Sequence, residues 1–309
     1  MLSYILRRLL IAIPTILLIV VLSFLIITAA PGGPFDAQEG GDIDPEIIAN
    51  LRAAYNLDKP ISTQLFLYMK GLVTGDLGPS FAFRGRSVSE IIANGFPVSA
   101  QLGLSAIGVG LVIGMLFGVF AAMRKNTAAD YAVMSLSMTG IAVPTFVTAP
   151  FLALIFGLYL KLLPIAGWGD GALRNMILPV TALALPKIGV IARITRGAML
   201  EVSRANHIRT ARSKGLPESI VIWRHTLRAA LIPIVSYLGP AIAGVMTGSV
   251  IIEQIFGLPG IGRSFVEGAL NRDYPVVMGI TILYATLIIV LNLITDLIYR
   301  VLDPRIRKD

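Results

Sequence analysis

The chain has 309 residues, of which 55% are hydrophobic and 14% are charged, and its mean hydropathy is +0.79. Soluble domains are about a quarter charged and less apolar, so this composition excludes a soluble enzyme, a disordered chain and a fibrous protein. The chain has no cysteine and only two histidines, which excludes disulfides and thiolate metal sites and argues against a histidine-built metal site. The net charge of +8 must then be interpreted from where the charges lie relative to a membrane.

Six stretches are long and apolar enough to cross a bilayer. A hydrocarbon core about 30 Å thick, crossed at about 1.5 Å per residue, needs roughly 20 apolar residues. The fourth stretch is the weakest because Pro179, Pro186 and Lys187 interrupt it, and we expect its helix to be locally broken at Pro186. The predicted fold class is all-α integral membrane, with six transmembrane helices at about Leu9–Ala30, Val98–Met123, Tyr131–Leu160, Met176–Thr195, Ala229–Ile252 and Val276–Tyr299.

The basic residues fall mainly on one side of these spans. With six spans and a cytoplasmic start, 16 lysines and arginines are cytoplasmic and nine are external, of which four lie outside the long first external loop. Cytoplasmic loops carry such an excess, and loops above about 60 residues cross the membrane whatever their charge. We therefore expect both termini in the cytoplasm. Arg7 and Arg8 precede an apolar run too long for a typical signal peptide, so the first span should be an anchor and not a cleaved signal.

The spans divide the chain into four segments. Residues 1–30 hold the cytoplasmic N-terminus and the first span, residues 31–97 form an external helical cap, residues 98–301 form a five-helix transmembrane core with a loop at 196–228, and residues 302–309 form a cytoplasmic tail. In the cap we expect a helix opened by Asp44 and Pro45, a second over about Ser62–Leu72 ended by Gly75, and a short third opened by a capping box at Ser87–Glu90 and ended before Phe96. The cap either only packs on the spans or also receives an external partner protein.

Residues Glu201–Pro217 form a polar block between the fourth and fifth spans. Its basic residues gather toward its C-terminal end, where they oppose the negative end of a helix dipole. Gly215 can adopt the left-handed conformation that ends helices, and Pro217 prevents continuation. We predict a short helix over about Arg204–Lys214 with an apolar stripe too thin for lipid. It either fits into a partner below the membrane or is a solvated basic loop.

This block resembles the EAA-type cytoplasmic loop of ABC importer permease subunits, in its peptide-permease form. The run His207–Pro217 is very close to that form, although Glu201-Val-Ser stands in place of Glu-Ala-Ala. Other blocks are similar to the B-type chain of dipeptide and oligopeptide permeases, so that the resemblance covers essentially the whole chain: Tyr4–Arg8, Ala30–Gly32, Phe256–Gly262, Asn271–Pro275 and Leu302–Arg305.

The resemblance implies that the loop helix is a coupling helix seated in a groove of an ATP-hydrolysing subunit. Arg209 and Arg212 are three residues apart and share a helix face, so they could pair with carboxylates there. The implied coupling residues are Glu201, Arg204, Ala205, Asn206, His207, Ile208, Arg209, Thr210, Ala211, Arg212, Lys214, Gly215, Leu216 and Pro217. The chain has no Gly-x-x-x-x-Gly-Lys-Ser/Thr loop, so we expect no cofactor in it, and ATP and Mg²⁺ on partner subunits.

The resemblance further implies a multi-pass protein of the bacterial inner membrane that is surrounded by lipid and binds no nucleic acid. Its implied partners are a homologous second permease, two ATPase subunits and an external substrate-binding protein. The implied function is ATP-driven import of di- or oligopeptides by alternating access. A nickel chelate, an opine or a sugar is an alternative substrate. A self-sufficient secondary transporter would need several charges at mid-membrane, and a membrane enzyme would need a catalytic constellation.

Candidates for the translocation path or a gate are Lys187, Glu253, Gly257, Pro259 and Gly260. An ionisable residue near a span centre faces protein or water because burying it in lipid costs roughly 2.5–3.5 kcal/mol. Lys187 therefore either lines the path or pairs within the assembly. The Gly-Pro cluster after Glu253 suits a re-entrant or lid-like external element.

Glycines recur in the second span, where Gly110, Gly114 and Gly118 form overlapping Gly-x-x-x-Gly pairs. Such pairs allow helices to approach closely. We expect them to pack the core of this chain, although the same surface could pack a sister permease.

Overall fold

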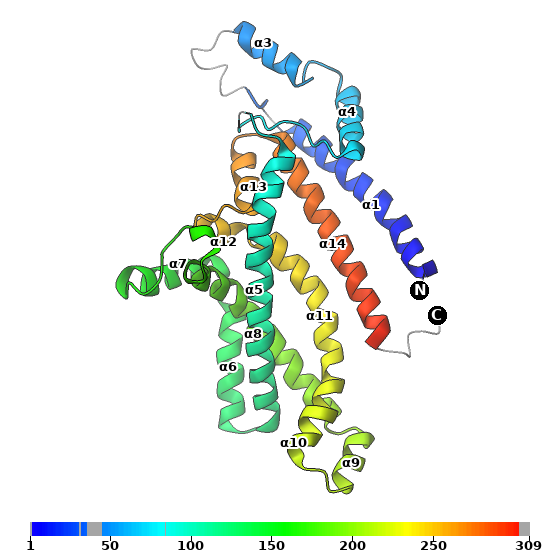
Figure 1. The fold of residues 1–309 in the computed structure, drawn as a ribbon, viewed down its shortest axis with the longest axis vertical. Coiled ribbons are helices and arrows are strands. Elements are labelled where there is room, and N and C mark those ends of the chain that lie inside the picture. The colour runs from blue at the N-terminus through cyan, green and yellow to red at the C-terminus, as the bar shows by residue number, and fades with distance from the viewer. Residues whose placement is uncertain (1, 31, 36–44, 84, 303–309) are drawn as a thin grey trace. The chain divides into compact units, whose positions relative to one another are not determined.

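The computed structural model describes residues 2–30, 32–35, 45–83 and 85–302, and their regular structure is helical (Figure 1). Among these residues, five helices are long and apolar enough to cross a membrane, and there are six candidate spans if one bent helix pair is counted as a single span. The five are Arg8–Ala29, Val88–Met123, Leu173–Val202, Glu218–Ile255 and Tyr274–Ile298. The chain divides into two compact units, residues 1–98 with 259–287 and residues 99–258 with 288–309.

The first unit contains the N-terminal span, the helices of residues 45–74 and two later helical segments. Its core includes Val88 and Ile91, which are buried against Val276 and Ile280. The first two predicted helices of the insertion are confirmed, and the predicted cap residue Asp44 lies outside the described residues. The elements are α1 (Leu2–Ala29), α3 (Pro45–Ala54), α4 (Ile61–Thr74), the start of α5 (Val88–Met123), α13 (Ile261–Leu270) and the start of α14 (Tyr274–Leu302).

A capping box opens α5, as predicted. The Ser87 N–H donates to Glu90 Oε2 at 3.1 Å, and the Glu90 N–H donates to Ser87 Oγ at 3.2 Å. The prediction that this helix ends before Phe96 is wrong, because α5 continues through Pro97 to Met123. Proline lacks a backbone N–H donor, so Pro97 removes one hydrogen bond from the helix. The other backbone groups can still form the internal hydrogen bonds that a membrane span requires.

The second unit is built around α8 (Leu173–Val202), which packs against α6, α7, α11 and α12. In Figure 1, α9 and α10 lie at one end of this unit, and α7 and α12 lie toward the other. Its other elements are the remainders of α5 and α14, α6 (Ala128–Ala142), α7 (Thr145–Leu152), the π-helix η1 (Ala153–Tyr159), the 3₁₀-helix η2 (Gly169–Gly171), α9 (Asn206–Ser213), α10 (Glu218–Ile220), the π-helix η3 (Val221–Thr226), α11 (Leu227–Gly248) and α12 (Val250–Ile255).

The third predicted span is broken into two segments. Helix α6 ends at Ala142, and the segment Thr145–Tyr159 leaves it at an angle of 102°. Val143 between them is extended, with φ −91° and ψ 121°, and Pro144 precedes α7. The break follows from Pro144, because a residue before a proline avoids the helical conformation.

The fourth predicted span is an unbroken helix. Helix α8 runs from Leu173 to Val202 through both Pro179 and Pro186, so the predicted break at Pro186 is wrong. Half of its most apolar window is buried in the chain, against 17% for the N-terminal span. Helix α8 tolerates its prolines and low hydropathy because its neighbours, and not lipid, surround much of it.

The glycines of the second span pack against α8. A Cβ added at Gly110 would lie 2.8 Å from Lys187 Cβ, and one added at Gly118 would lie 2.5 Å from Thr195 Cβ. Gly114 faces Ile191 Cβ in the same way, at 2.8 Å. The predicted core packing is thus realised within the chain, between α5 and α8.

Candidate functional site

The loop helix α9 begins at Asn206 and ends at Ser213, inside the predicted range Arg204–Lys214. Only three residues separate it from α8, and their backbone is bonded to the end of that helix. The Ser203 N–H donates to the Met199 carbonyl at 3.0 Å, and the Ala205 N–H donates to the Val202 carbonyl at 2.9 Å. The direction of α9 is therefore set by the end of α8.

The thin apolar stripe of α9 seats the helix on its own chain. Ile208 is fully buried and Ala211 is buried beside it. Both pack against the buried Val221 of η3, with Val202 and Ala205 at the edge of the cluster. Burying an isoleucine or valine side chain contributes about 1.5–3 kcal/mol, so α9 is packed in place and is not a loose loop.

The C-terminal end of α9 is a Schellman motif. Gly215 has φ +74°, in the left-handed region that favours glycine. The Gly215 N–H donates to the Arg212 carbonyl at 2.9 Å, and the Leu216 N–H donates to the Ala211 carbonyl at 3.4 Å. This is the stop that the sequence predicts, and Pro217 then leads directly into α10.

Arg212 has an intramolecular partner. Its Nη2 and Nε donate to the two carboxylate oxygens of Glu218 at 2.6 and 3.2 Å. The hydrogen bond to Glu218 raises the pKa of Arg212. Both side chains are about half exposed, at 45% and 56%, so the pair contributes less than about 1 kcal/mol to stability. Its effect is to hold α9 against α10, a role that the sequence did not predict for Arg212.

The outward face of α9 is polar and basic. Within the described residues, the side chains of Glu201, Arg209 and Lys214 form no hydrogen bond or ion pair. The exposed predicted residues of this region are Glu201, Arg204, Asn206, His207, Arg209, Thr210, Arg212, Lys214, Gly215, Leu216 and Pro217. A rigid helix thus presents donors and positive charge away from its own chain.

A buried ion pair joins α6 to α8. Arg196 Nε and Nη2 donate to the two carboxylate oxygens of Asp130 at 2.7 and 2.6 Å, and the Asn126 N–H donates to the same carboxylate at 2.9 Å. The Asp130 side chain is 1% exposed. This pair was not predicted from the sequence. The available signal was an acid in the first turn of an apolar span, three residues after the N-cap Thr127.

Lys187 lies halfway along α8 and is half-buried. Its Cβ lies beside Gly110 of α5. Among the described residues its ammonium group has no hydrogen-bond or salt-bridge partner. An unpaired ammonium at this depth is consistent with a wet path or with a contact to another chain.

Glu253 is fully buried. Its Oε1 accepts hydrogen bonds from Ser99 Oγ at 2.7 Å and Ser249 Oγ at 2.6 Å. The sequence suggested it only as a residue flanking the Gly-Pro cluster. Glu253 ties the short helix α12 to α5, and Gly257, four residues later, has φ +61°. Pro259 and Gly260 belong to the first unit, where Gly260 precedes α13.

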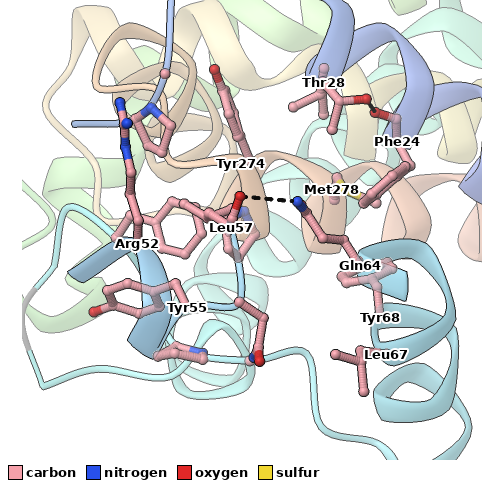
Figure 2. Close-up of a pocket in the computed structure, with 18 of the residues that line it drawn as sticks. Phe24, Thr28, Arg52, Tyr55, Leu57, Gln64, Leu67, Tyr68, Tyr274 and Met278 are labelled. Carbon is pink, nitrogen blue, oxygen red and sulfur yellow. Dashed lines mark hydrogen bonds between the residues drawn. The ribbon is translucent and has the colours of Figure 1, made fainter. Parts of the chain in front are cut away.

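The first unit contains a pocket of about 490 Å³ (Figure 2). Its lining is mainly apolar and comes from the end of α1, from α3 and α4 and from the start of α14. The Gln64 amide donates to the Leu57 carbonyl at 3.3 Å along one wall. Burial raises the pKa of Tyr68, whose hydroxyl has no hydrogen-bond partner among the described residues. These linings offer apolar contact and not an acid–base constellation.

The two candidate sites therefore lie in different places. The residues for which we predict a coupling role lie on α9 and on the segments directly before and after it. Of the path candidates, Lys187 lies halfway along α8, and Glu253 and Gly257 lie in and just after α12. In the second unit the loop helix is at one end and α12 is toward the other (Figure 1).

Comparison with known proteins identifies close relatives over the whole chain. The oligopeptide transport system permease protein OppB of Escherichia coli (strain K12) is 52% identical over 307 residues, which cover 99% of this chain and 100% of that protein. OppB of Haemophilus influenzae is 48% identical with the same coverage. The dipeptide transport system permease protein DppB of Bacillus subtilis is 42% identical over 99% of this chain and 98% of its own length.

Solved structures share the fold. The inward-facing MetNI methionine ABC transporter matches with a TM-score of 0.56 and 16% identity over 69% of this chain and 96% of that chain. An amino acid ABC transporter matches with a TM-score of 0.52 and 18% identity over 69% and 94%. The model of binding-protein-dependent transport system inner membrane components matches residues 114–308, and its N-terminal companion matches residues 1–103. The chain belongs to this family of inner membrane components of binding-protein-dependent transport systems.

Proposed function

We propose that this chain is the membrane-spanning permease subunit of an ATP-driven, binding-protein-dependent importer of di- or oligopeptides. The observation that carries the proposal is the full-length identity of 52% with a permease named for oligopeptide transport. The chain is a transport subunit and not an enzyme. Selectivity for peptides over a nickel chelate, an opine or a sugar follows from these relatives and not from a residue of the spans.

The chain forms half of a translocation path with a homologous second permease. Two ATPase subunits bind ATP and Mg²⁺ and dock on the loop helices, and an external binding protein delivers the substrate. The charge distribution supports an orientation with both termini in the cytoplasm. Residues 31–97 then form the external cap, and residues 98–301 form the permease core.

Helix α9 is the coupling helix in this proposal. The packing of Ile208 and Ala211 holds α9 rigidly against its own chain. The Schellman motif at Gly215 fixes the direction in which the chain leaves the helix. Arg209 is exposed, and its side chain has no partner among the described residues, so it is the residue best placed to bond a carboxylate of the ATPase. Arg212 is held by Glu218 and positions the end of the helix.

Lys187, Glu253 and the Gly-Pro cluster through Gly260 belong to the path or its gate in this proposal. The support for Lys187 is its half-buried position in the middle of α8, where its ammonium group has no partner in the part of the chain that the structure describes. The support for Glu253 is complete burial of a carboxylate that two serine hydroxyls hold in place.

The proposal is tested by transport in proteoliposomes. The chain, its neighbouring permease and the two ATPases are reconstituted, the binding protein is added outside with a radiolabelled tripeptide, and ATP with Mg²⁺ is supplied to the ATPases. We expect uptake that requires ATP and is competed by peptides and not by a nickel chelate or a sugar. Uptake driven by an ion gradient without ATP would make the chain a secondary transporter, and competition by the other solutes alone would refute the peptide substrate.

A matched pair of variants tests the coupling residue in the same vesicles. Arg209→Glu reverses the charge of the outward face of α9 and should abolish ATP-driven uptake. Lys125→Glu reverses an exposed charge in the turn between α5 and α6 and should leave uptake unchanged. Equal uptake in the two variants would refute the role of Arg209.

A further inference from the structure

The buried pair Asp130–Arg196, here called the α6–α8 clamp, lies where the core helix α8 approaches the loop helix. Arg196 is six residues before the end of α8 at Val202, and α9 begins at Asn206. Asp130 lies in the first turn of α6, directly after the short connection from α5. The clamp therefore fastens the beginning of one span to the end of the helix that leads into α9.

The geometry of the clamp is rigid. The guanidinium of Arg196 meets the carboxylate with two parallel hydrogen bonds, at 2.7 and 2.6 Å, and the Asn126 N–H adds a third at 2.9 Å. Such bidentate pairs fix orientation as well as distance. The carboxylate is 1% exposed and Arg196 is 26% exposed, so water does not compete for it.

A series of contacts runs from α9 through α8 and this clamp to α12, beside the direct contacts of α8 with α7 and α12. Ile208 and Ala211 seat α9 on Val202 at the end of α8, and the clamp fastens α8 to α6. Helix α6 leads through the 102° bend into α7. Helix α7 packs against α12, which carries the buried Glu253. All of these contacts lie within the second unit.

We propose that the clamp makes α6 and α8 move as one body, so that displacement of α9 by the ATPases reaches the bend and α12. The inference rests on the proposed function. Asp130 and Arg196 are thus positioning residues of the transport cycle. Replacing a buried ion pair by apolar residues is often neutral or stabilising, so stability alone does not account for a charged pair at this joint.

The test is the number of peptides transported per ATP hydrolysed by the reconstituted complex. In Asp130→Asn and Arg196→Gln we expect this ratio to fall about fivefold or more, the lower end of typical coupling between sites, while ATP hydrolysis continues. The double variant should be no worse than either single variant, because residues that act as a unit are not additive. Arg196→Lys keeps the positive charge but cannot form two parallel hydrogen bonds to the carboxylate. Its ratio of peptides transported to ATP hydrolysed should therefore lie between those of the wild type and Arg196→Gln. Lys125→Gln removes an exposed charge near Asp130 and should leave the ratio unchanged.

The outcomes separate this proposal from the proposed function. A wild-type complex that transports no peptide would overturn the function, whereas an unchanged ratio in the assembled variants would overturn the clamp alone. Equal losses of transport and ATP hydrolysis in the variants would mean that the pair has only a structural role, and this result would also overturn the proposed role of the clamp.

A second measurement leaves both clamp residues unchanged. Because the chain has no cysteine, single cysteines that carry spin labels can replace the exposed Tyr131 of α6 and Ser213 of α9. With the clamp intact, we expect the same distance between the two labels in the nucleotide-free and in the ATP-bound complex. A distance that changes between these states would overturn it.

Discussion

Substitution of Gly118 by alanine should destabilise the protein by forcing α5 away from α8. The added Cβ would lie 2.5 Å from Thr195 Cβ and 2.6 Å from the Ala192 carbonyl oxygen. Carbon atoms in contact prefer about 3.5–4.0 Å, so the two helices must separate locally by about 1 Å. The Ala192 oxygen is backbone and cannot rotate away.

The expected cost follows from similar overpacking in protein cores. Inserting a methyl group into a packed core costs about 1–3 kcal/mol. Because about 1 kcal/mol lowers the Tm by about 2–4 °C in proteins of 150–250 residues, we expect a loss of about 2–12 °C for Gly118→Ala.

The assay is thermal unfolding of the purified complex in one detergent, with Gly108→Ala as the matched control. A Cβ at Gly108 meets no atom within 4 Å, and alanine is favoured over glycine in helices by about 0.5–1 kcal/mol. The control should therefore keep or slightly raise the Tm. Equal Tm values for the two variants would refute the packing of α5 on α8 through Gly118.

Three further predictions concern the loop helix and the possible gate. Ile208→Ala leaves a cavity between α9 and Val221, at a cost of about 2–5 kcal/mol. Hydrogen exchange in α9 should therefore accelerate, and less ATPase should be recovered in a pull-down. Unchanged exchange would contradict the packing of α9 through Ile208. Gly215→Ala places a Cβ at φ +74°, which costs about 1–2 kcal/mol, so ATPase pull-down should also weaken; Gly197→Ala, which meets no atom within 4 Å, is the control. Gly257→Ala with Gly260→Ala should reduce uptake and leave the complex intact by size exclusion, and unchanged uptake would rule out a gate there.

Much of the fold was predictable because a bilayer constrains it strongly. Apolar runs of roughly 20 residues located the five long candidate spans of the described residues, including the weak fourth stretch, and the bent helix pair. Local signals were equally dependable: the capping box at Ser87–Glu90 and the stop at Gly215 both appear in the structure as hydrogen bonds. These features depend on residues that are close together in the sequence, so they can be predicted from one amino-acid sequence.

What the sequence could not provide depends on residues far apart in the chain. The span with Pro144 bends by 102°, whereas α8 continues through Pro186 as one helix, and the helices that bury half of its most apolar window come from other parts of the chain. Asp130 and Arg196 are 66 residues apart, and neither position alone indicates a partner. The positive charge of Arg212 suited a docking surface, but in the structure this residue forms an ion pair with Glu218 of the same chain.

The central claim is tested most directly by the mass of the complex that this chain forms. The chain is tagged, expressed with its native gene neighbours, purified in a mild detergent and weighed intact by mass spectrometry. The account predicts one copy of this chain, one related permease and two ATPase copies, with the ATPases lost on Arg209→Glu. A chain that emerges alone, or as a homo-oligomer that still transports, would contradict the assignment as one subunit of an ATP-driven importer.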